Sequence, residues 1–287
     1  METGIALIMI IGYKINKEPE LGYQFIKDLP DYVRAYPLIN FFEANLALRS
    51  GNNEEALAIL NQFDVGSVQM PFDHYNYMYG NVYLRKLDPK SRYYFNQFLS
   101  KTKYKSYTKE VTYKIAESYL VEGNTSQYEI YKEKAEDTEP DELVERDREA
   151  IYDSELDYDP HPSLLRVKLL VMGGYLNKAE QELTAYMSNP GLREVDKADY
   201  HLQYGKLLFR QKKRQLAIIE LEKAIDRNPD SDYQIAAEAA VVLGRIYEYT
   251  SLEQAREYYN MAIEVYEEEY YEVIESYAKR RLDVLGS

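Results

Sequence analysis

The chain has 287 residues, of which 45% are hydrophobic and 29% are charged, so intrinsic disorder is excluded and buried cores are expected. It has no cysteine, which excludes disulfide frameworks, thiol nucleophiles and thiolate zinc sites. Its formal net charge of −14 makes nucleic acid an unfavourable partner, because phosphates repel an acidic protein. The longest apolar run, residues 5–11, is far shorter than the roughly 20 residues that cross a bilayer, and no membrane span or intact signal peptide is expected.

Pairs of helices are predicted from the N-terminus onward. Apolar residues at helical spacing over residues 5–13 and 21–29 form the first pair. In the second pair, Ala44 precedes Ala56 by twelve residues, and Gly51 supplies the turn between the two helices. The sequence therefore begins as a series of helix-turn-helix units.

The same unit recurs along the chain. A small residue on the first helix lets the second helix approach closely, and larger apolar residues further on continue the buried stripe. The residues that anchor the first helices are separated by 36, 36, 51, 38 and 39 positions. They are Ala44, Gly80, Ala116, Val167, Gly205 and Gly244.

The one long interval, between Ala116 and Val167, predicts an inserted element. Apolar residues at loosely helical spacing indicate an extra helix near residues 141–155. A closing helix is expected near residues 274–285, where it would cap the last pair.

The clearest unit resembles a known family. It carries, in order, Tyr204, Gly205, Leu208, Ala217, Leu221, Ala224 and Pro229. This pattern is similar to the tetratricopeptide repeat, TPR, whose unit is typically about 34 residues long. The resemblance covers most of the chain and is weakest around Gly80 and Ala116, where Arg92 and Tyr128 occupy positions that the pattern reserves for alanine. The order of units also resembles uncharacterised bacterial TPR proteins with a central insertion.

The resemblance implies an all-α fold, a right-handed α-solenoid of helix-turn-helix repeats that forms one domain over residues 1–287. Its N-terminal repeats would span residues 1–138, and an acidic inserted helix and loop would span residues 139–160. The C-terminal repeats and capping helix would span residues 161–287.

Sequence patterns for catalysis, cofactors and metals are poorly matched. His74, His161 and His201 lie far apart, and none belongs to a His-Glu-x-x-His motif, which argues against a zinc hydrolase. The alternating acids of residues 153–159 lack the glycine and the final glutamate of a calcium loop. The glycine pair at 173–174 lacks the lysine of a phosphate-binding loop. We therefore predict no catalytic residue, no cofactor and no metal.

A stripe of residues on the first helices supplies the candidate binding site. Phe41, Asn45 and Arg49 share one helical face because they are four residues apart, and the same kinds of residue recur 36 positions later. An amide can donate to and accept from a peptide backbone, arginine can bind a carboxylate, and an aromatic ring offers an apolar wall. The next stripes comprise Tyr77, Asn81, Arg85, Tyr113 and Glu117.

The TPR resemblance gives this stripe a function. In the family, first helices line a concave groove, and residues at the positions that match Asn45 and Asn81 often hold a bound peptide through its backbone. The resemblance therefore implies a peptide-binding groove. The alternative is that the polar residues are merely solvated and that the aromatic residues form core between repeats.

Charge is distributed unevenly along the chain. Residues 129–159 contain fourteen acids and four bases, whereas residues 85–114 contain nine bases and two acids. The two blocks either neutralise one another within the solenoid, or the basic block recruits an acidic partner and the acidic helix competes with it internally. In the second case, deletion of residues 141–157 should raise the affinity for the partner.

The sequence thus predicts a non-catalytic scaffold that binds a peptide or protein segment in a concave groove. The alternatives are a hydrolase or transferase with inward-facing carboxylates from several helices of an α/α array, and a structural oligomerisation module. Residues 1–34 have no polar capping helix and are expected to dock on another subunit or on a larger parent chain. The absence of cysteine is compatible with cytoplasm and periplasm alike.

Overall fold

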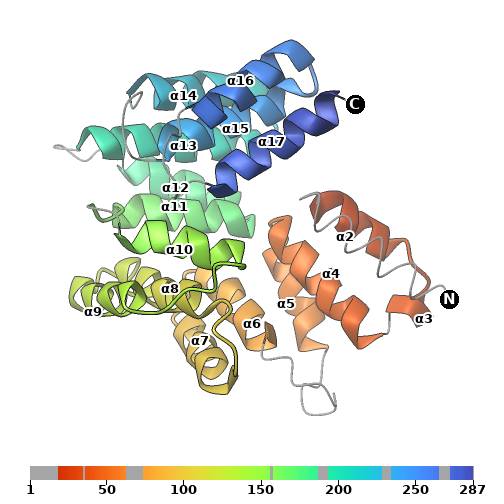
Figure 1. The fold of residues 1–287 in the computed structure, drawn as a ribbon, viewed down its shortest axis with the longest axis vertical. Helices are drawn as coiled ribbons and strands as arrows, with labels where there is room; N and C mark the ends of the chain where they lie inside the picture. The colour runs from red at the N-terminus through yellow and green to blue at the C-terminus, as the bar shows by residue number, and fades with distance from the viewer. Residues whose placement is uncertain are drawn as a thin grey trace. The chain divides into compact units, whose positions relative to one another are not determined.

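The computed structural model describes residues 19–34, 36–62, 74–155, 158–186, 193–227, 234–264 and 272–286. All regular structure in these ranges is α-helical, and consecutive helices pack in pairs (Figure 1). The predicted all-α fold of repeated helix pairs is therefore confirmed. The helix expected over residues 5–13 lies outside the described residues.

The chain divides into two compact units, Met1–Tyr104 with Met172–Tyr175, and Lys105–Val171 with Leu176–Ser287. The organisation into one domain that we expected from the sequence stays a prediction.

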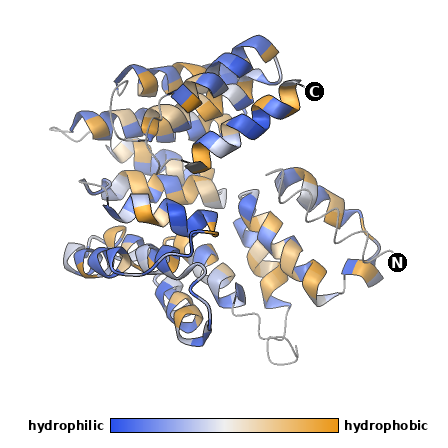
Figure 2. Ribbon diagram, viewed as in Figure 1, coloured by the Kyte–Doolittle hydropathy of each residue, from blue (hydrophilic) through white to orange (hydrophobic). Residues whose placement is uncertain are grey.

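The first unit contains two well-defined helix pairs, α4 with α5 and α6 with α7. The apolar core beneath them includes Ile39, Ala44, Ala56 and Met78. Orange and blue residues alternate around these helices in Figure 2, as expected when one face of each helix is buried. The helices are α2 (Pro19–Lys27), α3 (Asp31–Arg34), α4 (Pro37–Arg49), α5 (Asn53–Asn61), α6 (His74–Arg85) and α7 (Lys90–Lys101).

The second unit contains the pairs α8 with α9, α13 with α14, and α15 with α16. The predicted inserted helix is α10, which packs on α8 and α9, and the predicted closing helix is α17, which packs on α15 and α16. The helices are α8 (Thr108–Leu120), α9 (Thr125–Glu136), α10 (Glu145–Glu155), α11 (Pro162–Gly173), α12 (Leu176–Tyr186), α13 (Glu194–Arg210), α14 (Arg214–Arg227), α15 (Ile235–Tyr247), α16 (Leu252–Glu264) and α17 (Glu272–Gly286).

Glycine anchors allow the two helices of a pair to approach closely. A Cβ atom added at Gly205 would lie 2.6 Å from Cγ of Leu221 on the partner helix, and one added at Gly244 would lie 2.7 Å from the ring of Tyr259. Both distances are shorter than van der Waals contact allows. The packing reason inferred from the sequence is therefore visible in the structure.

We expect the substitution Gly205→Ala to lower the free energy of unfolding by about 1–2 kcal/mol, because Leu221 must leave its packed position to admit the added methyl group. Chemical denaturation monitored by circular dichroism measures the change. Gly286→Ala is the matched control, since an added Cβ there meets nothing within 4 Å. Equal stability of the two variants would contradict this account of the anchor.

The structure corrects the register of the weakest repeat. Arg92 was expected at the position of the small residue on the second helix, but the buried small residue there is Ser91, which is 0% exposed. Ser91 follows Gly80 by eleven residues, as Ala255 follows Gly244. The spacing in this unit is thus the shorter of the two spacings found along the chain.

A left-handed backbone residue marks the turn inside five helix pairs. Such a conformation favours glycine, which has no Cβ to clash with the backbone. Three of the five turns use glycine, whereas Leu87 and Lys212 adopt the same conformation at φ of 59° and 62°. The five turn residues are Gly51, Leu87, Gly123, Gly174 and Lys212. The repeat is therefore recognisable in the backbone conformation of its turns as well as in its buried residues.

Candidate functional site

The predicted stripe of the first unit lies on α4 and α6. Phe41 packs edge-on against Tyr75, with ring centroids 5.6 Å apart, and Tyr77 packs against the same apolar core. Asn81 is 4% exposed and donates from Nδ2 to the carbonyl oxygen of Tyr77 at 2.8 Å. These contacts tie much of the stripe to its own unit.

The other polar members of this stripe differ from one another. Arg85 is buried, and its guanidinium donates to the carbonyl oxygen of Leu48. Arg49 is partly exposed at the end of α4. Asn45 is partly exposed too, but its side-chain oxygen is buried and accepts no hydrogen bond. No described residue satisfies this acceptor.

The remaining predicted residues, Tyr113 and Glu117, lie on α8 of the second unit. Tyr113 is 5% exposed and packs with Ala135 of α9 and Ala150 of α10. Glu117 is 8% exposed and makes no hydrogen bond or ion pair among the described residues. The role of the stripe in binding a peptide stays a prediction.

Glu117 belongs to a group of charges in the second unit that the sequence did not reveal. One lysine, Lys168 of α11, experiences the charges of four carboxylates, each from a different helix. We refer to these five residues as the Lys168 cluster. They are Glu117 of α8, Asp153 of α10, Lys168 of α11, Asp199 of α13 and Glu238 of α15.

Burial disfavours the charged forms of the residues in the Lys168 cluster. Its members are buried or partly exposed, and desolvation is the largest influence on the pKa of each. The pKa of Asp153 is raised to about 7, chiefly by burial; Lys168 lowers it, and Glu117 and Glu238 contribute to the rise. Burial alone would lower the pKa of Lys168, but the four surrounding carboxylates raise it above its ordinary value. The lysine is therefore charged, and the four carboxylates share its single positive charge.

Two carboxylates of the cluster have partners and two do not. Glu238 forms an ion pair with Lys206, and Asp199 accepts a hydrogen bond from Nε2 of Gln203 at 2.8 Å. Glu117 and Asp153 make no hydrogen bond or ion pair within the described part of the chain, and neither does Lys168. These three ionisable side chains thus interact through their charges alone within the described ranges.

Gln203 adds a further unsatisfied acceptor beside the cluster. This side chain is 3% exposed, and its Oε1 atom is buried without a hydrogen-bond partner. A buried amide oxygen without a donor costs about 1–3 kcal/mol. Gln203 therefore carries an acceptor that no described residue satisfies.

The inserted helix α10 is held by a carboxylate cap. Asp147 is 0% exposed and accepts hydrogen bonds from the backbone N–H groups of Tyr107 at 2.9 Å, Glu110 at 3.0 Å and Asp141 at 3.1 Å. Two of these groups belong to the start of α8, whose first N–H groups have no partner within the helix. Asp147 thus joins the insertion to α8, and α10 brings Asp153 into the Lys168 cluster.

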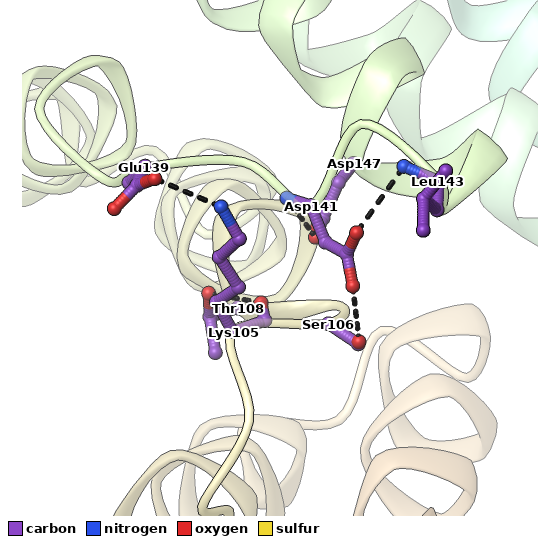
Figure 3. A network of polar contacts seen from close by, with 7 residues as sticks. All are labelled: Lys105, Ser106, Thr108, Glu139, Asp141, Leu143 and Asp147. Carbon is purple, nitrogen blue, oxygen red and sulfur yellow. Dashed lines mark hydrogen bonds and ion pairs between the residues drawn. The ribbon is translucent and has the colours of Figure 1, made fainter.

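Part of the acidic block pairs with part of the basic block, as Figure 3 shows. Lys105 forms an ion pair with Glu139 at 2.8 Å, and Ser106 donates to Asp141. Lys109 is 2% exposed and donates to the carbonyl oxygens of Ala135, at 2.8 Å, and of Glu136, at 3.0 Å. These contacts favour neutralisation within the fold, while Lys101 and Lys103 stay exposed.

None of the helices in the described ranges is long and apolar enough to cross a membrane. The described residues also contain no group of histidine, aspartate and glutamate side chains suited to a metal ion.

Comparison with known proteins places one unit of this chain in a family. Residues 199–231 match a family model described as tetratricopeptide repeat. Residues 199–231 are a tetratricopeptide-repeat (TPR) unit. Among similar solved structures, a tetratricopeptide repeat protein from Parabacteroides merdae ATCC 43184 is 16% identical over 98% of each chain, with a TM-score of 0.35. That likeness carries no further argument, and no curated protein matches.

The matched TPR unit consists of α13 and α14 and contains part of the candidate site. Asp199 of the Lys168 cluster lies in it, together with the adjoining Gln203 and Lys206. One of the five cluster residues thus lies on the first helix of the unit whose family is identified.

A repeat register links the Lys168 cluster to the predicted stripe. The position that directly follows the anchor is polar in all six TPR-like units. The anchors themselves are buried. In order, this position holds Asn45, Asn81, Glu117, Lys168, Lys206 and Arg245. Lys168 therefore occupies the same place in its unit as Asn45 does in its own.

This repeat register is the sequence signal from which Lys168 could have been predicted. We followed the stripe in steps of 36 residues, and the interval of 51 that contains the insertion ended it at Glu117. Continued from the later anchors, it leads to Lys168 and Lys206. A second signal is an acid six residues before the anchor, present as Asp199 and Glu238. Asp153 lies on the insertion, outside any repeat register, so no sequence signal identified it.

Proposed function

We propose that this protein is a non-catalytic interaction scaffold that binds a segment of a partner protein along the first helices of its repeats. TPR repeats generally mediate interactions between proteins. The observation that carries the proposal is the polar position after each anchor, which repeats through six units and includes Lys168 and Asn45, whose side-chain oxygen has no partner among the described residues. Polar groups that the fold leaves unsatisfied are available to a ligand.

The stripe predicted from the sequence is part of this proposal. In the first unit, Asn45 would bind the backbone of the partner segment, and Phe41 and Tyr77 would support it with their rings. In the second unit, the Lys168 cluster would bind side chains of the segment. The mechanism is preorganisation, because packed helices present these groups without first having to be ordered.

Capture of binding proteins from an extract of the native cells tests the proposal. The site variant is Glu117→Gln with Asp153→Asn, which removes two negative charges from the Lys168 cluster. The matched control is Glu253→Gln with Glu257→Gln, which removes two negative charges from exposed positions on α16. We expect the control to retain the proteins captured by the wild type and the site variant to lose them. The proposal is wrong if both variants capture the same proteins in the same amounts.

The enzyme alternative has one observation in its favour. Acids from four separate helices gather around Lys168, and a carboxyl group with a pKa near 7, such as that of Asp153, suits general acid catalysis. The pairing of Lys206 with Glu238 and the TPR match favour a binding surface instead. Hydrolysis of model glycosides and esters by the wild type, abolished in Asp153→Asn, would establish the enzyme.

A further inference from the structure

We infer that the exposed face of α7 and the residues that follow it are a second docking surface, which binds an acidic segment of a partner protein. Helix α7 is the second helix of its pair, whereas the proposed function places the partner along first helices. We refer to this part of the first unit as the α7 surface. It consists of five exposed residues, Lys90, Tyr93, Lys101, Lys103 and Tyr104.

Helical geometry brings members of the α7 surface together. Lys90, Tyr93 and Lys101 occupy one face of α7, since their spacing returns to the same side of the helix. At a rise of about 1.5 Å per residue, Lys90 and Lys101 lie about 17 Å apart along the axis. Beyond the helix end, Oγ1 of Thr102 donates to the carbonyl oxygen of Tyr104 at 3.1 Å. A surface of this length matches about five residues of an extended segment.

Positive charge is concentrated at the α7 surface. Residues 89–109 contain six bases and no acid, in a chain whose net charge is −14. The later bases of this run, Lys105 and Lys109, have partners within the second unit. Lys101 and Lys103 are exposed, and their side chains make no hydrogen bond or ion pair with a described residue. The α7 surface therefore carries positive charge that complements an acidic segment.

Two tyrosines give the α7 surface an apolar component. Tyr93 is 61% exposed and Tyr104 is 78% exposed. The ring of Tyr93 packs edge-on against Tyr94, with centroids 5.1 Å apart, and Tyr94 stacks on Tyr83 of α6 at 5.3 Å. Lys90 extends over the same ring of Tyr83, with Nζ 5.6 Å from its centroid. Tyrosine is enriched at protein interfaces, and these rings offer flat apolar contacts to side chains between the acids of the segment.

A protein segment fits the α7 surface better than a nucleic acid does. A nucleic acid is a continuous polyanion, and the phosphates that extend past the surface are repelled by a chain of net charge −14. A protein segment has an uncharged backbone, so its few carboxylates can all lie at the lysines. The segment therefore carries acids about five residues apart, with an apolar residue between them.

Fluorescence anisotropy at low salt tests the inference. The probe is a capped, labelled peptide of sequence Glu-Glu-Gly-Leu-Gly-Glu-Glu, and the control peptide has glutamine in place of each glutamate. We expect the glutamate peptide to bind at least about 10-fold more tightly than the glutamine peptide. Its affinity should fall as salt is added, because exposed charges are screened. A long single-stranded thymidine oligonucleotide should bind more weakly than the glutamate peptide.

Variants locate the binding on the first unit. Lys101→Gln with Lys103→Gln should weaken binding of the glutamate peptide by about 5- to 10-fold. The matched control is Lys212→Gln with Arg280→Gln, which removes two exposed positive charges from the second unit and should leave the affinity unchanged. Circular dichroism establishes that each variant is folded.

A second pair of substitutions tests the rings. Tyr93→Ala with Tyr104→Ala should weaken binding of the glutamate peptide by about 3- to 10-fold while its dependence on salt is retained. Both rings are exposed, so their loss leaves the fold intact.

Equal affinities for the glutamate and glutamine peptides would overturn the inference, and so would no binding at all or an unchanged affinity in the double lysine variant. Tighter binding of the oligonucleotide would overturn the choice of a protein segment. These results leave the proposed function untouched, because its site variant, Glu117→Gln with Asp153→Asn, changes neither α7 nor the residues that follow it.

Discussion

The substitution Lys168→Met is expected to lower the free energy of unfolding by about 2–4 kcal/mol at pH 8. Removal of the lysine leaves the carboxylates of its cluster without the positive charge that acts on all of them, and a buried charge left uncompensated typically costs about 3–5 kcal/mol. Partial exposure of the cluster reduces that figure. Urea denaturation measures the change.

The effect of Lys168→Met should depend on pH in a defined direction. The folded state raises the pKa of Lys168, so its stabilisation is fully present below the unfolded pKa of about 10.4 and is lost as the pH rises through the folded value. In the variant, acidification protonates the carboxylates and so reduces the uncompensated negative charge. The loss of stability should therefore be smaller at pH 5 than at pH 8.

Controls separate the cluster from general effects of charge. Lys223→Met removes a lysine that pairs with Glu220 on the exposed surface of α14 and should cost less than about 0.5 kcal/mol. Asp153→Asn added to Lys168→Met should restore part of the lost stability, since it removes one unpaired charge. A loss that is the same at both pH values and is not relieved by Asp153→Asn would show that the cluster is not electrostatically coupled.

The substitution Asp147→Ala is expected to lower the free energy of unfolding by about 2–3 kcal/mol. It leaves three backbone N–H groups without their acceptor, two of them at the start of α8. Part of the cost is offset, because burial raises the pKa of Asp147 and its removal relieves a desolvated charge.

Hydrogen exchange identifies the origin of this change. The amide protons of Tyr107 and Glu110 should exchange faster in Asp147→Ala, while amides in α13 and α14 should lose protection only as far as the global stability falls. Glu142→Ala is the matched control, because Glu142 is an exposed acid a few residues before Asp147. If Asp147→Ala and Glu142→Ala destabilise the protein equally, the cap has no structural role.

The helix pairs could be predicted from the sequence because their cause is local. A small residue such as Gly205 is required where two helices approach, and its partner Leu221 follows at a fixed distance along the chain. The same reasoning misplaced one position, Arg92 for Ser91, because two spacings of eleven and twelve residues both occur. The inserted and closing helices were found as interruptions of the repeat.

The candidate site could be predicted only in part, because its members meet through packing of separate units. Glu117 was identified by its repeat position, but its proximity to Asp153 depends on how α10 packs against α8. Burial also changes what a residue can do. Asn81 and Arg85 have the types expected of binding residues, yet they bond to the backbone of their own unit.

The central claim is that Lys168 and the four carboxylates around it, which come from separate helices, form one electrostatically coupled cluster. The most direct measurement is a carbon-13 NMR titration of the Asp153 carboxyl, assigned by its absence in Asp153→Asn. The account predicts a midpoint at about pH 7 in the free protein. Lys168→Met should raise this midpoint, because the positive charge of Lys168 favours the ionised form of Asp153. A midpoint near the ordinary value of about 4, or one that Lys168→Met does not move, would contradict the account.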